Sequence, residues 1–257
     1  MKFGVWKALA RGVVLESVRR KDLWVVAILG FLIMAGAGML GFFGLKGLET
    51  FAKDLAASVL GMFSTVMAVL VGSRVMPEEI KNRTLYPLLA RPITRFDLLF
   101  GKFIGATWVT WIAFLLLAGL TSLALAMFQV PFEAVMGQYL IAKMLGLSVI
   151  VAVSMTLSVF MTASAAATMS FVLAFGSSMI IRALVMAYES SSPAFQVVFK
   201  FLNAILPQYG LFDLGSRAAN GWGPVQAWVL GALAAYALVY SSAMLSIGWL
   251  KFRKQAI

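Results

Sequence analysis

The sequence predicts an all-α polytopic membrane protein, on the evidence of its composition and of its long unbroken apolar runs. Of the 257 residues, 62% are hydrophobic and 12% are charged, and the mean hydropathy is +0.94. A soluble domain cannot hide that much apolar surface from water. Several apolar runs of about 20 residues match the roughly 30 Å hydrocarbon thickness of a bilayer. A membrane β-barrel would instead alternate polar and apolar residues in strands of about ten residues.

The chain is expected to form one transmembrane domain, residues 1–257, with six spanning helices. A charged segment, 74–102, separates the second span from the third, and a long segment, 188–224, separates the fifth from the sixth. The uncharged stretch 161–168 predicts a tight hairpin of small residues packed inside the protein, with a ligand-contacting turn as the less favoured alternative. The predicted spans are 23–44, 55–73, 103–128, 139–161, 165–187 and 225–250.

The N-terminal segment, 1–22, is basic and loosely amphipathic. Phe3, Trp6, Ala10 and Val13 follow helical spacing, which predicts a helix that lies in the membrane interface with the tryptophan at headgroup level. The alternative is a frayed tail whose charges only set the topology.

The distribution of lysine and arginine predicts the orientation in the membrane. Fifteen of these residues fall on the side that holds both termini and segment 74–102, against six on the other side even when Lys143 and Arg182, near span ends, are included. Because loops rich in basic residues stay in the cytoplasm, we expect both termini and segment 74–102 to be cytoplasmic, in an inner (plasma) membrane. The net charge of +11 suits anionic lipid headgroups at the span ends, so we expect lipid contact and no nucleic-acid partner.

The residue types in the chain argue against several classes of chemistry. Cysteine and histidine are absent, so a disulfide framework, thiolate chemistry and a zinc or haem site are not expected. No predicted span holds paired carboxylates, and we therefore expect no catalytic residue, no metal site and no cofactor bound by this chain. Ionisable residues are nearly absent from the spans, which argues against a proton- or sodium-coupled carrier and favours an apolar or amphipathic substrate, or one moved through a large opening at a dimer interface.

The charged segment begins with signals for a short helix. Pro77 suits the first turn of a helix, and Glu78 and Glu79 complement the positive end of its dipole. We expect this cytoplasmic helix to run to about Leu89. A solvated loop that only sets the topology is the alternative.

The same segment ends with signals for the next helix. Pro92 disfavours helical backbone at the residue before it, Arg91. The four residues from Thr94 to Asp97 resemble a capping box, which predicts that the helix entering the third span starts here. Gly101 and Gly105 predict close packing on a neighbouring helix.

The stretch from Glu79 to Lys102, EIKNRTLYPLLARPITRFDLLFGK, resembles the cytoplasmic segment of ABC-2 type transporter permeases. The shared pattern is an acidic residue, Thr-Leu, Leu-Leu, a small residue, Pro-Ile, Thr-Arg and a final Gly-Lys pair. In architecture the resemblance extends over the whole chain, through the six spans, the basic N-terminal helix and the long outer segment.

The resemblance implies a permease subunit that exports a hydrophobic or amphipathic substrate. It implies pairing with a second permease subunit, in a homodimer or a heterodimer, and docking of a cytoplasmic ABC ATPase on which ATP and Mg would be bound. The N-terminal helix would lean on the same ATPase. Carried onto this chain, the residues that would contact or brace the ATPase are Glu78, Glu79, Arg83, Thr84 and Leu85.

The sequence lacks the GxxxxGK[ST] phosphate loop, and we therefore expect ATP hydrolysis on a separate polypeptide. Three alternatives stay open at this point. The chain is a membrane subunit that does mechanical or assembly work on an extracytoplasmic partner, a secondary carrier, or, least favoured, an intramembrane enzyme.

The outer segment carries a second amphipathic pattern, ended by Pro207. Its helical spacing predicts a helix at the outer leaflet. Phe195, Phe199 and Leu202 are candidates for an outer gate over a substrate path, and a plug that only seals a dimer is an equal alternative. The residues at helical spacing are Phe195, Val198, Phe199, Leu202, Ile205 and Leu206.

Overall fold

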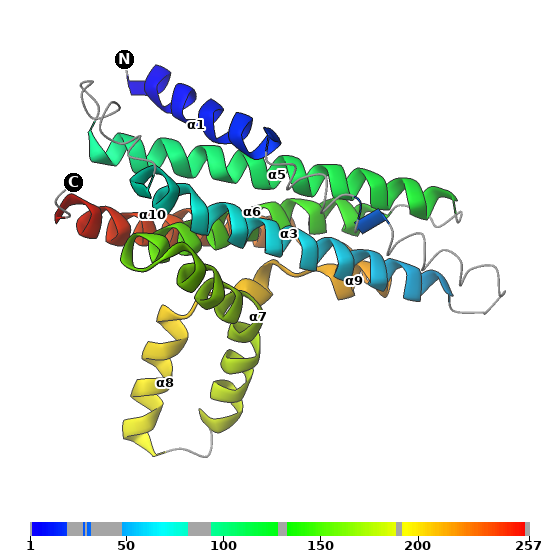
Figure 1. Cartoon of the computed structure of the whole chain (residues 1–257). Helices are drawn as coiled ribbons and strands as arrows, with labels where there is room; N and C mark the ends of the chain where they lie inside the picture. The colour runs from blue at the N-terminus through cyan, green and yellow to red at the C-terminus, as the bar shows by residue number, and fades with distance from the viewer. Residues whose placement is uncertain are drawn as a thin grey trace.

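The structure is a computed structural model, and all the secondary structure in the residues it describes is helical (Figure 1). It describes residues 2–19, 28, 30–31, 48–81, 94–127, 133–188 and 192–254. The elements in this part of the chain are α1 (Lys2–Arg19), α3 (Leu48–Lys81), α5 (Arg95–Met127), α6 (Ala134–Phe160), α7 (Ala163–Tyr188), α8 (Pro193–Ile205), the 3-10 helix η1 (Tyr209–Phe212), α9 (Gly215–Ala219) and α10 (Ala227–Lys254).

Five of these helices, α3, α5, α6, α7 and α10, are long and apolar enough to cross a membrane. They coincide with the second to sixth predicted spans, so the prediction of a polytopic α-helical membrane protein is confirmed. The first predicted span, 23–44, lies outside the described residues except for Ile28, Gly30 and Phe31, which are helical.

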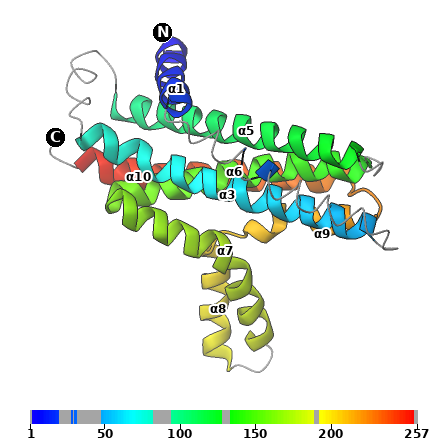
Figure 2. The ribbon, with the colours of Figure 1, turned by 45° about the vertical axis from the view of Figure 1, so that its right-hand side comes forward.

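Helix α6 lies at the centre of a bundle that it forms with α3, α5 and α10 (Figures 1 and 2). Its residues 149–156 are all buried, as expected for a helix that is apolar around its whole circumference. Small residues allow the close crossings. A Cβ atom built on Gly72 of α3 would lie only 3.0 Å from the carbonyl oxygen of Val151, so a larger residue there would force α3 away from α6.

Helix α1 packs across the first turns of α5 and buries Leu9, Ala10 and Val13. A Cβ atom on Gly101 would lie 2.8 Å from Leu9 Cδ1, and one on Gly105 would lie 2.8 Å from Ala10 Cα. The close packing predicted from this glycine pair is therefore confirmed, and its partner is the N-terminal helix.

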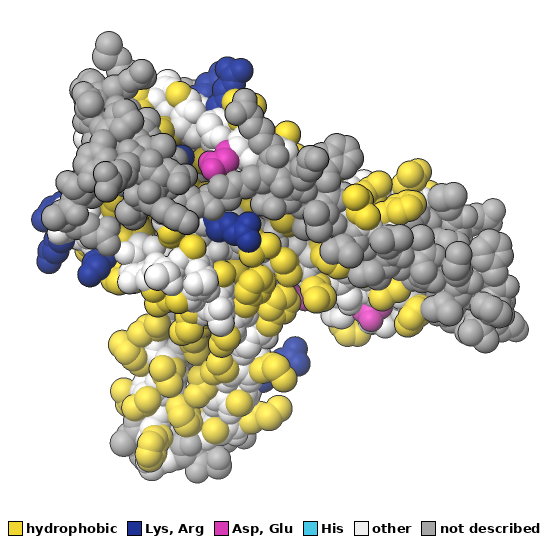
Figure 3. All heavy atoms as spheres, viewed as in Figure 1, with side chains coloured by type: hydrophobic (Ala, Val, Ile, Leu, Met, Phe, Trp, Pro, Cys, Tyr) yellow, Lys and Arg dark blue, Asp and Glu magenta, His cyan; other side chains and the backbone are white. Residues whose placement is uncertain are grey.

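The second half of α7 and all of α8 project away from the bundle as a hairpin (Figures 1 and 2). Apolar side chains cover the hairpin (Figure 3). Such a surface suits hydrocarbon rather than water. The most exposed of these side chains are Met179, Val185, Met186, Phe195, Val197 and Phe201.

Two local predictions were wrong. Pro77 does not start a separate helix but lies inside α3, which continues to Lys81. A proline removes one N–H donor from a helix, and membrane helices tolerate this loss. The hairpin at 161–168 is tight, since only Met161 and Thr162 separate α6 from α7, but it is not packed inside the protein. Its small residues Ser164 and Ala165 are exposed because they lie in the first turn of α7, just after α6 has ended.

Candidate functional site

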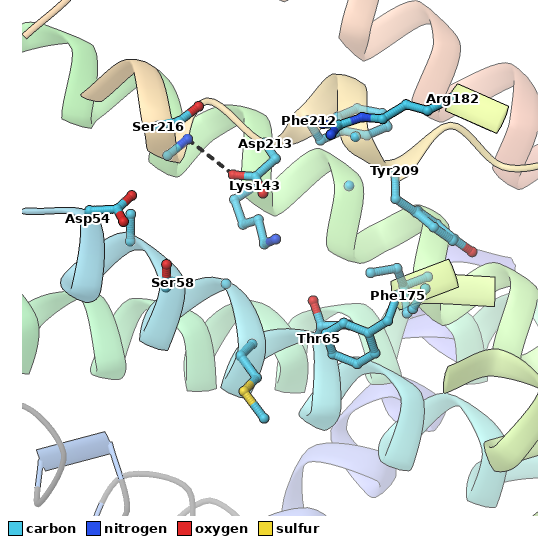
Figure 4. A pocket seen from close by; sticks show the side chains of 18 residues that line it. Asp54, Ser58, Thr65, Lys143, Phe175, Arg182, Tyr209, Phe212, Asp213 and Ser216 are labelled. Atoms are coloured by element: carbon cyan, nitrogen blue, oxygen red, sulfur yellow. Dashed lines mark hydrogen bonds between the residues drawn. The ribbon is translucent and has the colours of Figure 1, made fainter. Parts of the chain in front are cut away.

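A cavity of about 480 Å³ lies between α3, α6, α7 and the segment that holds η1 and the start of α9 (Figure 4). Helices α3 and α6 run in the same direction along it, and α7 runs the opposite way. Its polar lining side chains include Asp54, Ser58, Thr65, Lys143, Arg182, Tyr209, Asp213 and Ser216.

Lys143 extends from α6 into this cavity (Figure 4). The sequence placed it near the end of a span, but α6 begins at Ala134, so the lysine lies well inside the helix. A Cβ atom on Gly61 of α3 would lie 3.3 Å from its Nζ, and this glycine therefore leaves the space that the ammonium occupies.

Asp213, between η1 and α9, faces the lysine and attracts it electrostatically. Its Oδ1 accepts a hydrogen bond from the backbone N–H of Gly215 at 3.1 Å, drawn as the dashed line in Figure 4. A Cβ atom on Gly215 would lie 3.0 Å from the Cβ of Ala57, so the absence of a side chain lets this turn approach α3. The carboxylate is thus held at the cavity by its own turn.

The wall beside these charges is tightly packed. Phe212 is fully buried, and a Cβ atom on Gly146 would lie 2.8 Å from its Cβ. The hydroxyl of Tyr139 donates a 2.9 Å hydrogen bond to the carbonyl oxygen of Ala57, which ties α6 to α3. Burial raises the pKa of the Tyr209 phenol, and the neighbouring Tyr240 and Tyr236 raise it further.

The cavity lining combines charged and apolar side chains. Asp54 lies near the start of α3, and Arg182 reaches the cavity from α7, on the side of Phe212 and Tyr209 (Figure 4). The apolar lining residues include Met62, Ile150, Ala174 and Phe175. Such a mixed lining suits a ligand with a polar head and an apolar body.

Two of the five residues predicted to contact an ATPase lie at the far end of α3 from Asp54. Glu78 and Glu79 are in its last turn, and Arg83, Thr84 and Leu85 lie outside the described residues. The described end of α3 therefore lies away from the cavity.

The predicted capping box is confirmed. The backbone N–H of Asp97 donates to Thr94 Oγ1 at 3.1 Å, and the backbone N–H of Thr94 donates to Asp97 Oδ2 at 3.3 Å. Sequence reasoning missed two further contacts of this turn, since both join residues far apart in the chain. Trp6 Nε1 donates to Asp97 Oδ1 at 2.9 Å, and an Arg95 guanidinium N–H donates to the carbonyl oxygen of Phe252 at 2.9 Å.

The three outer-gate candidates lie on α8, which forms where the sequence predicted a helix. Phe195 is 61% exposed, Leu202 is 38% exposed and Phe199 is partly buried. Within the described part of the chain, none of the three lines the cavity, whose aromatic residues are Phe175, Tyr209 and Phe212. Whether α8 gates a path or only seals a dimer stays a prediction.

Comparison with known proteins gives one family. A family model described as "Protein of unknown function (DUF2705)" matches residues 23–257, which include all five long apolar helices and the whole cavity. A search of curated proteins gives no match. The matched description assigns no activity, so the resemblance to ABC-2 permeases stays a prediction.

Proposed function

This chain belongs to the DUF2705 family, whose description assigns no activity, and from its residues we propose that it is the membrane-spanning permease subunit of an ABC-2 type transporter. It forms the substrate path, and a separate cytoplasmic ATPase supplies ATP hydrolysis. The substrate is hydrophobic or amphipathic and is exported.

The observation that carries this proposal is a set of hydrogen bonds in segment 79–102, the ABC-2-like segment. The first turn of α5, which belongs to this segment, is capped by Thr94 and Asp97, and the same turn is bonded to α1 through Trp6 and to the end of α10 through Arg95. A force that an ATPase applied to segment 74–102 would therefore act on three helices through direct hydrogen bonds.

The remaining parts of the proposal follow from the charges and the surface. Both termini and segment 74–102 are cytoplasmic in a plasma membrane, and the start of α1 and the end of α10 lie at the same end of the bundle (Figure 1). The cavity then opens toward the outer side. The apolar α7–α8 hairpin supports contact with lipid or with a second permease subunit (Figure 3).

One observation favours a second candidate, a secondary carrier. Ionisable residues are scarce in the predicted spans, yet Asp54, Lys143 and Asp213 line one cavity. Charged groups that line a cavity in a membrane protein are common in ion-coupled carriers. The two candidates differ in whether movement of substrate requires the ATPase.

Co-purification from the native membrane tests the proposal. We expect an ATPase with a phosphate loop to elute in equal amounts with the tagged chain. Leu85→Asp and Glu79→Arg should each abolish co-elution of the ATPase, while the chain stays in the membrane. Leu211→Asp, an exposed leucine of η1 on the proposed outer side, is the matched control and should retain the ATPase. An ATPase-free wild-type chain that still moves substrate would favour the carrier.

A further inference from the structure

We propose that the cavity between α3, α6 and α7 binds an amphiphile whose headgroup carries both a primary ammonium and an anionic group. The inference deepens the proposed function by naming the substrate class. It rests on that function only for the movement of the ligand, because binding itself requires no ATPase.

The charges of the cavity balance. The described lining residues include two cations, Lys143 and Arg182, and two carboxylates, Asp54 and Asp213. A ligand with a single charge would attract one pair and be repelled by the other. A ligand with both signs pairs with all four groups.

Among the described residues, the opposite charges of the cavity are not already joined in ion pairs. Lys143 and Asp213 attract one another electrostatically, but within the described residues no ion pair joins them. By contrast, Lys53 and Glu133 nearby are closed into a contact of 2.7 Å. The space between the lysine and the aspartate is therefore available for the two charges of a headgroup.

The carboxylates select the kind of cation. Ionised Asp54 and Asp213 only accept hydrogen bonds, and one oxygen of Asp213 is already bonded to Gly215. A primary ammonium offers three N–H donors to the remaining oxygens, whereas a quaternary ammonium offers none. The anionic group faces Lys143 and Arg182, whose charge-assisted hydrogen bonds suit phosphate or carboxylate.

The apolar side chains of the cavity accommodate the chain of the amphiphile. Met62 and Phe175 line the cavity, and they are 56% and 48% exposed. Residues that face both the cavity and the apolar surroundings of a membrane helix provide a lateral opening. The headgroup then occupies the cavity while the acyl chain stays in the hydrocarbon of the bilayer.

Binding of fluorescent lysophospholipids to the purified chain in a non-ionic detergent tests this. Three probes share one acyl chain and differ in headgroup: ethanolamine, choline and glycerol. We expect saturable binding of the ethanolamine probe, about tenfold tighter than either of the others, since a charge-assisted hydrogen bond is worth about that factor. Lys143→Gln and Asp213→Asn should each weaken it by about tenfold. Lys200→Gln, on exposed α8 and away from the cavity, is the matched control and should bind as the wild type.

A second variant guards against loss of folding in the charge variants. Ser58 is exposed and lines the cavity, so Ser58→Phe fills it without removing a charge. We expect this variant to elute like the wild type on size exclusion and to lose ethanolamine-probe binding. Equal binding of all three headgroups, a preference for the glycerol probe, or unchanged binding in Ser58→Phe overturns the proposal. Absence of an ATPase from the co-purification would contradict the permease function without changing the binding result. Loss of selective probe binding would contradict the binding proposal without contradicting the permease function.

Discussion

The indole Nε1 of Trp6 donates a 2.9 Å hydrogen bond to Oδ1 of Asp97, and this bond joins α1 to the first turn of α5. The other carboxylate oxygen accepts hydrogen bonds from the backbone N–H and the hydroxyl of Thr94. Asp97 is only 6% exposed. A single buried carboxylate therefore caps one helix and anchors another at the end of the ABC-2-like segment.

Trp6→Phe is expected to loosen this anchor without opening the helix cap. Phenylalanine keeps an aromatic ring against Phe100, whose centroid lies 4.9 Å from that of the tryptophan, and removes the N–H donor together with part of the indole ring. We expect the free energy of unfolding to fall by about 1.5–3 kcal/mol, the usual worth of a hydrogen bond to a charged group. Denaturant titration in mild detergent measures this. The same change at exposed Trp222 should have no effect, and equal losses at both positions would contradict the account.

Gly105→Ala is expected to displace α1 from α5. The added Cβ would lie 2.8 Å from Ala10 Cα and 2.9 Å from its carbonyl oxygen, and these backbone atoms cannot rotate away. Overpacking of this kind costs about 1–3 kcal/mol. On the same helix, a Cβ on Gly119 would meet nothing within 4 Å, so Gly119→Ala is the matched control. Thermal unfolding should separate the two variants, and a stable Gly105→Ala would show that this crossing is not tight.

Stability is expected to fall at alkaline pH, in part because of Tyr209. Its burial raises the pKa of the phenol above that of an ordinary tyrosine. As the pH rises past about 10, the unfolded chain therefore releases a proton that the folded chain keeps, and this favours unfolding. The loss of unfolding free energy above this pH should be smaller in Tyr209→Phe than in the wild type. Tyr188→Phe, at a partly exposed ring, is the control, and an unchanged pH slope in Tyr209→Phe would contradict the prediction.

The proposed orientation predicts which residues can be labelled from outside the cell. The chain has no cysteine, so each introduced cysteine is a unique label. A membrane-impermeant maleimide should modify Asn220→Cys in intact cells. It should modify Gly4→Cys and Lys254→Cys only after the membrane is permeabilised. The reverse pattern would place the cavity on the cytoplasmic side.

Local features of the fold were predictable from the sequence. The length of an apolar run decides whether a helix can cross a membrane, so the spans now seen as α5, α6, α7 and α10 were found. The capping box at Thr94 and Asp97 was found because its partners are three residues apart. The start of α3 was not found, because Lys53 interrupts the apolar pattern and its ion-pair partner, Glu133, is distant in the sequence.

The cavity was missed for the same reason. Asp54, Lys143 and Asp213 come from three separate parts of the chain, and no spacing within any of them indicates that they meet. One signal was available. A lysine inside an apolar run is costly in a membrane and is by itself a marker of a functional site. Placing Lys143 at a span end removed that signal, and the true start of α6 at Ala134 restores it.

The most direct test of a permease driven by a separate ATPase is the accessibility of its cavity during ATP turnover. A Ser58→Cys chain, reconstituted into vesicles with its co-purified ATPase, is treated with an impermeant maleimide from the proposed outer side. The account predicts modification at a rate that changes when ATP and Mg are supplied to the ATPase, and no such change with Leu85→Asp in the same chain. A modification rate that is the same with and without ATP would contradict it.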